Sequence, residues 1–180
     1  MNAVELLQRL HQHRAWVNRN LLTAAATLSD EPLRSAFPIG QGSVWKSLLH
    51  LYAAEYVWLE ALLGNEGFLV PGDLPGQIPG NQQGEGGVTD LADLRLKWSE
   101  LEKRWTGYLA TLSSAALEEV VYRKSISLGT RLGTRRSDVL LHVCTHAHYT
   151  AAQVVNMLRH TGMEKLPETM LISLARHETK

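Results

Sequence analysis

The residues most able to do chemistry near neutral pH in this 180-residue chain are its eight histidines. His142 and His146 are four positions apart, so on a helix they project from one face about one turn apart. His50 lies in a separate apolar segment beside the small residues Ala53 and Ala54, which leave room around an imidazole. Because neutral imidazoles from two segments can share one divalent ion, we take His50, His146 and His142 as candidate metal ligands. Surface or hydrogen-bonded core histidines are the alternative.

Two other side chains could take part in chemistry. Glu55 follows His50 by five positions, which turns it away on a helix, so we expect an ion pair between helices rather than a direct catalytic role. Cys144 precedes His148 by four positions, which could favour a thiolate, although a lone cysteine on a helix is more often simply packed.

A block of basic residues lies between Glu119 and Asp138 with no acidic residue inside it: Arg123, Lys124, Arg131, Arg135 and Arg136. Because the block leads into the start of a predicted helix, it could attract a carboxylate or a phosphate on a substrate. The alternative is a solvated loop that faces acidic segments of a dimer partner.

Hydrophobic periodicity predicts four long helices that must position these groups. The long 65–88 connection between the second and the third of them is rich in glycine and proline. On the first helix we place Arg14, Asn18 and Arg19 toward solvent. Residues 120–132 suit a short hairpin or an extended crossover, with Gly129 and Gly133 at turns. We expect helices at 2–28, 43–64, 89–112 and 137–162, and a short helix after Pro167. Together these segments predict one domain, 1–180, formed by an all-α four-helix bundle.

Composition narrows the function. Eighteen basic and eighteen acidic residues give a formal net charge of zero, which argues against nucleic-acid binding. No apolar run is long and free enough of charge to cross a membrane. The single cysteine excludes an internal disulfide, and no leader precedes the first amphipathic segment, so we expect a cytoplasmic protein.

Two stretches of the sequence resemble the DinB/YfiT-like bundle proteins. The first runs from His11 to Gly64 and the second from Ser137 to Gly162, so the likeness covers nearly the whole chain. The first stretch carries Trp16, Asn18, Ser43-Val44-Trp45, Leu49-His50, Glu55 and Trp58. The second carries Ser137-Asp138-Val139-Leu140-Leu141-His142-Val143, then His146, Tyr149, Gln153, Leu158 and Arg159.

This resemblance implies an up-down-down-up bundle, often a homodimer, with a divalent ion held by one histidine of the second helix and two of the fourth. Zinc or nickel suits imidazole ligands. Some relatives are thiol-dependent transferases and others are isomerases or hydrolases, so the family indicates a site more than a reaction.

The sequence departs from the family pattern at one ligand position. Aligned from Gln153, the usual pair on the last helix would be His146 and the residue four later, which is Thr150. Either His142 replaces the missing ligand, or His50, His146 and Thr150 or water form a weaker site, or no metal binds. We expect a metal-dependent enzyme acting on a small molecule, a thiol-dependent transferase or a hydrolase. The alternative is a metal-free, non-catalytic bundle for ligand binding or homodimer assembly.

Overall fold

The computed structural model describes residues 1–124 and 129–179, and its main elements are helices. The four long helices are α1 (Ala3–Ala25), α3 (Val44–Leu62), α4 (Leu91–Ala110) and α5 (Arg136–His160). The smaller elements are α2 (Asp30–Arg34), the 3-10 turn η1 (Ala115–Glu118), β1 (Val120–Lys124), β2 (Arg131–Arg135) and α6 (Leu171–Glu178). Across the described residues, no helix combines the length and the apolar character needed to cross a bilayer.

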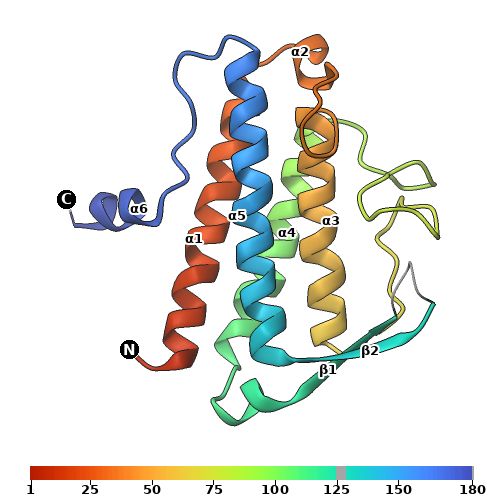
Figure 1. The fold of residues 1–180 in the computed structure, drawn as a ribbon, viewed down its shortest axis with the longest axis vertical. Helices are drawn as coiled ribbons and strands as arrows, with labels where there is room; N and C mark the ends of the chain where they lie inside the picture. The colour runs from red at the N-terminus through yellow and green to blue at the C-terminus, as the bar shows by residue number, and fades with distance from the viewer. Residues whose placement is uncertain (125–128, 180) are drawn as a thin grey trace.

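The long helices form a bundle in which α1 and α5 run in one direction while α3 and α4 run in the other, as Figure 1 shows. Two consecutive parallel helices need a connection that returns along the bundle, and the chain from 63 to 90 provides it. Helix α3 is buried on most of its surface, as its nearly continuous apolar sequence predicts. The core is completed by side chains such as Trp98 and Trp105 from α4 and Leu140 and Met157 from α5.

Side chains at the helix starts explain where the helices begin. In α1, Asn2 and Glu5 form a reciprocal capping box. In α3, the Ser43 hydroxyl accepts from the Lys46 amide at 3.1 Å, as expected for the predicted start. In α4, the capping residue is Asp90, one position after the predicted Thr89, because its carboxylate accepts the Asp93 amide.

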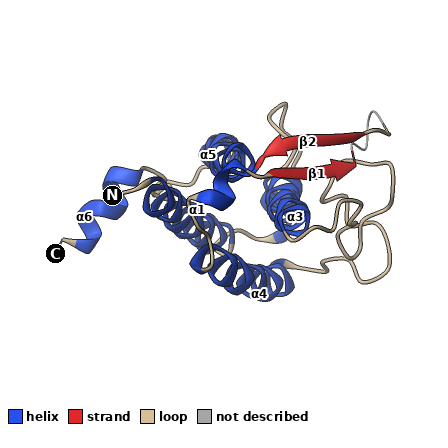
Figure 2. Ribbon diagram, turned by 90° about the horizontal axis from the view of Figure 1, so that it is seen from below, coloured by secondary structure: helices blue, strands red, loops and turns tan. Residues whose placement is uncertain are grey.

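The all-α bundle was predicted with a short hairpin or an extended crossover at 120–132, and the structure has a two-stranded hairpin there. Strands β1 and β2 pair in an antiparallel hairpin that packs beside α3 and α5 (Figure 2). Gly129 has a positive φ of 63°, which suits a turn, but Gly133 lies within β2 and not at a turn. A β-carbon on Gly133 would meet the Tyr122 ring at 2.9 Å, so its role is close packing. The predicted hairpin includes residues 125–128, which lie outside the described residues.

A second difference lies between α1 and α3, where the sequence predicts only an irregular connection. Residues 30–34 form α2 instead. Its Pro32 falls in the first turn, where the missing N–H costs nothing, and Asp30 and Glu31 suit the positive end of a helix. The predicted short helix after Pro167 is present as α6.

The placement of Arg14 and Asn18 toward solvent was wrong, because both side chains belong to a buried polar network. Arg14 is 2% exposed and Asn18 is 3% exposed. Arg14 pairs with Glu55 of α3 and with Glu102 of α4, the latter at 2.9 Å. Glu55 also accepts from Asn18 at 2.7 Å and from the Trp98 indole at 3.0 Å. The network joins three helices through groups that are costly to bury alone.

His11 extends this network toward α5. Its Nε2 donates to the Leu140 carbonyl at 3.2 Å, and its Nδ1 accepts from the Arg14 Nε at 3.3 Å. That arrangement needs a neutral imidazole with the proton on Nε2. Burial, followed by the nearby charge of Arg14, lowers the pKa of His11 to about 3.

Candidate functional site

His50 and His146 meet between α3 and α5. Their Nε2 atoms are 3.2 Å apart and their ring centroids 5.2 Å apart, although the residues are separated by 96 positions in sequence. Two imidazole nitrogens bound to one tetrahedral ion at about 2.0–2.1 Å would lie about 3.3 Å apart. The pair therefore has the spacing of two ligands of one ion. Burial, followed by the neighbouring His50 and His142, lowers the pKa of His146 to about 4, so its imidazole is neutral at pH 7 and able to coordinate.

The ring of His50 is held by the long connection between α3 and α4. Its Nδ1 lies 2.9 Å from the carbonyl oxygen of Pro79. Only a protonated nitrogen can donate to a carbonyl, so the proton is on Nδ1 and the Nε2 lone pair faces His146. In metal sites, a hydrogen bond from the ring nitrogen that does not bind the metal is the usual means by which proteins orient a histidine ligand.

The connection is itself organised by one buried carboxylate. Asp73, 6% exposed, accepts from the Gly80 amide at 2.7 Å and from the Gln82 amide at 2.9 Å. These bonds place Pro79 against α3. Gly80 comes so close to the helix that a β-carbon there would lie 2.6 Å from the Cα of His50. The sequence does not predict this contact, because its glycine-rich composition indicates only an irregular segment.

We predict that Gly80→Ala disrupts this orientation while the matched change Gly76→Ala does not. Both glycines have positive φ, so both substitutions carry similar backbone strain, but nothing lies within 4 Å of a β-carbon at Gly76. Gly80→Ala should lower the free energy of unfolding by roughly 1–3 kcal/mol more than Gly76→Ala does, which is the usual penalty of overpacking. The tautomer of His50, read from imidazole ¹⁵N shifts, should become mixed only in Gly80→Ala. Identical spectra for the two variants would show that the close approach does not orient His50.

His142 lies one turn before His146 on α5 but is more exposed. Its ring is 5.7 Å from that of His146 and meets the ring of Trp58 edge-on at 5.3 Å. Burial, followed by the charge of Arg123, lowers the pKa of His142. Within 1–124 and 129–179, no group of three histidine, cysteine or acidic side chains is arranged to hold an ion. The structure thus brings together two of the three predicted ligands and leaves the third beside them.

Thr150 is the residue that the resemblance predicts at a ligand position. It is 2% exposed and lies outside the lining of the pocket that contains the histidines. Cys144 is also outside this lining, and burial raises the pKa of its thiol to about 12, so it is a packed thiol and not a thiolate.

The three histidines line a pocket of about 560 Å³ between α3, α5, the hairpin and the long connection. Its remaining walls are largely apolar, and two further polar groups reach it from the hairpin. The lining comprises His50, Ala54, Val57, Trp58, Gly76, Gln77, Ile78, Pro79, Val121, Arg123, Leu132, Thr134, His142 and His146. This size and composition are typical of a site for a small molecule.

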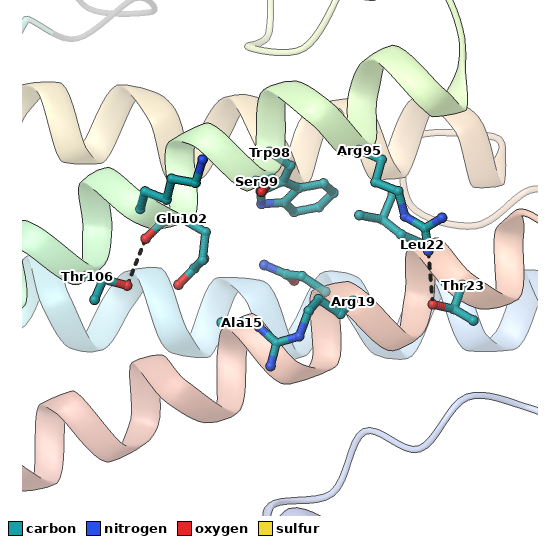
Figure 3. A pocket seen from close by; sticks show the side chains of 11 residues that line it. Ala15, Arg19, Leu22, Thr23, Arg95, Trp98, Ser99, Glu102 and Thr106 are labelled. Atoms are coloured by element: carbon teal, nitrogen blue, oxygen red, sulfur yellow. Dashed lines mark hydrogen bonds between the residues drawn. The ribbon is translucent and has the colours of Figure 1, made fainter.

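A separate groove of about 600 Å³ runs between α1 and α4. Figure 3 shows Trp98 and Glu102 of α4 facing Ala15 and Arg19 of α1 across it. Three members of the buried network, Asn18, Trp98 and Glu102, line this groove, and its described lining includes no histidine. The histidine pocket is therefore the better candidate for chemistry.

Comparisons with known proteins agree with this architecture. No curated protein matches the chain. Among solved structures, YfiT from Bacillus subtilis, described as a probable metal-dependent hydrolase with an unusual four-helix bundle topology, is similar at a TM-score of 0.62. It is 19% identical, and the match covers 89% of this chain and 90% of YfiT, which supports the likeness in fold. The model of the DinB family matches residues 1–178, and the chain therefore belongs to the DinB family.

Proposed function

We propose that the protein is a divalent-metal-dependent enzyme that acts on a small molecule in the histidine pocket, by hydrolysis or by transfer to a thiol. The observation that carries the proposal is the 3.2 Å separation of the Nε2 atoms of His50 and His146 at the wall of a 560 Å³ pocket. The description of YfiT as a probable metal-dependent hydrolase supports it.

The residues present fit an ion such as zinc or nickel. His50 and His146 would hold it, and His142, which lines the same pocket one turn earlier on α5, is the weaker third candidate. When bound, such an ion supplies Lewis acidity and lowers the pKa of a coordinated water or thiol. Pro79 keeps the Nε2 of His50 directed at the site. Val57, Trp58 and Val121 form an apolar wall of the pocket.

The nature of the lining also bears on the reaction. Among the described residues that line the pocket there is no cysteine or serine, and Thr134 supplies their one hydroxyl group. The nucleophile would therefore be water or a thiol that enters with the substrate. A homodimer remains part of the proposal, on the strength of the family resemblance alone.

The expected result of a metal titration is one zinc or nickel ion per chain, measured by elemental analysis after desalting and by calorimetry. His50→Ala and His146→Ala should each lower the affinity about 100-fold or more, because each removes a ligand. His142→Ala should lower it about tenfold, in the range seen when a supporting group is lost. His148→Ala is the matched control, since this exposed histidine lies on α5 near His13 and outside the pocket. A parent protein that takes up no ion would favour the non-catalytic alternative.

A further inference from the structure

The basic block of the sequence is mostly neutralised within the chain. Arg131 makes two 2.7 Å hydrogen bonds to Glu66. Arg136 pairs with Glu119 at 2.6 Å, and Arg135 lies 3.6 Å from Glu118. Three of the five basic residues therefore have acidic partners that precede the hairpin in the same chain, and they need no substrate or partner protein.

Arg123 differs from these three. It lies on β1, is partly buried, and its guanidinium carbon stands 4.8 Å from the centroid of the Trp58 ring. Among the residues that the structure describes, none forms an ion pair or hydrogen bond with its side chain. Burial alone lowers the pKa of Arg123, as expected for a cation withdrawn from water without a counter-charge. Arginine stays protonated despite this burial. The side chain of Arg123 is therefore a charge without an anionic partner among the described residues.

The pocket around Arg123 likewise lacks negative charge. Its described lining contains Arg123 and three histidines but no aspartate or glutamate. The positive charge of Arg123 is close enough to contribute to the lowered pKa of His142, after burial. A divalent ion on the histidines would raise the formal charge of the lining to +3. An anion that enters the pocket would offset part of this charge.

We propose that Arg123 is the specificity-determining anchor for a substrate that carries a carboxylate on a small apolar body. The proposal rests on the proposed function in taking the histidine pocket as the substrate site. The planar guanidinium matches a carboxylate with two parallel hydrogen bonds, and its carbon lies 4.8 Å from the centroid of the Trp58 ring. Val57, Val121, Leu132 and Ile78 provide the apolar surface for the rest of the molecule. A row of four rings connects the anchor to the paired imidazoles. It runs from Trp58 through His142 and His146 to His50, and neighbouring ring centroids are 5.2–5.7 Å apart.

The test compares benzoate with benzamide, which has nearly the same shape but no charge. Binding is measured by calorimetry and by NMR titration, with the full chain both metal-free and zinc-loaded. The parent should bind benzoate at least about tenfold more tightly than benzamide, since a hydrogen-bonded charge contributes roughly that factor or more. Arg123→Gln should abolish the difference, and Arg123→Lys should retain part of it. Arg131→Gln, which removes a paired arginine from the other strand, should leave it unchanged.

Equal affinity for benzoate and benzamide in the parent, or an unchanged difference in Arg123→Gln with native circular dichroism, would overturn the proposal. Lack of detectable benzoate binding would do the same. The metal-free arm separates this result from the proposed function, because the anchor does not need the ion. Stoichiometric zinc without discrimination refutes the anchor alone, whereas discrimination without zinc uptake refutes the metal-dependent enzyme and keeps the anchor.

Discussion

Replacing Glu55 by alanine should lower the free energy of unfolding by about 3–5 kcal/mol, the usual cost of removing one member of a buried ion pair. Glu55 is 1% exposed and accepts hydrogen bonds from Arg14, Asn18 and Trp98. Its loss leaves a buried guanidinium with only Glu102 as counter-charge. For a chain of this size the midpoint of thermal unfolding should fall on the order of 10 °C. Calorimetry and urea titration measure both quantities.

Two further variants show whether the buried charge is the cause. Glu100→Ala removes an exposed partner of Lys103 on the same helix as Glu102, and should change the unfolding free energy by less than about 1 kcal/mol. The double variant Arg14→Met with Glu55→Leu should recover part of the loss, because the fully buried charges are removed together and Glu102, which loses its partner, is partly exposed to water. If Glu55→Ala were as stable as Glu100→Ala, the network would not have the structural role that its burial indicates.

Acid should destabilise the fold through His11 between about pH 6.5 and pH 4. The pKa of His11 is about 3 in the folded chain, against about 6.5 when unfolded. In that interval the unfolded chain binds more protons than the folded one, so stability is complete above pH 6.5 and decreases as the pH falls. Each pH unit in the interval costs about 1.4 kcal/mol, which gives roughly 3 kcal/mol by pH 4.

The measurement is the urea midpoint as a function of pH for the parent and for His11→Gln, which cannot titrate. The difference between the two curves should shrink toward pH 4, because the parent alone has this proton-linked loss. His177→Gln serves as a control, since His177 is exposed and contacts Glu168. Parallel curves for the parent and His11→Gln would refute the assignment of the acid sensitivity to His11.

The sequence was most informative where the determinants are local. Ser43 and the Asn2–Glu5 pair begin helices through contacts within one turn, and the hydrophobic period of 91–112 is that of α4. The proximity of His50 and His146 also followed, because both lie on apolar helices that a bundle must bring together. The ligand role of these residues and of His142 stays a prediction.

The features that sequence reasoning missed depend on distant partners. Arg14 has a periodic position compatible with solvent, and only Glu55 and Glu102 from two other helices make its burial favourable. The Pro79 carbonyl is a backbone group, which has no signature in side-chain spacing. Arg131 finds its partner Glu66 65 positions away in the sequence. The sequence therefore could not show that Arg131 is paired whereas Arg123 has no acidic partner among the described residues.

The hydrogen bond between Pro79 and His50 couples two parts of the protein that differ in character. The long connection has little regular structure, whereas His50 belongs to the most buried helix of the bundle. A ligand that fixes the imidazole of His50 must also favour the observed position of the connection, and the coupling free energy is the same in both directions because such linkage is reciprocal. The glycine- and proline-rich segment is thus coupled to the interior of the bundle. The resistance of its backbone to proteolysis should therefore increase when a ligand fixes the imidazole of His50.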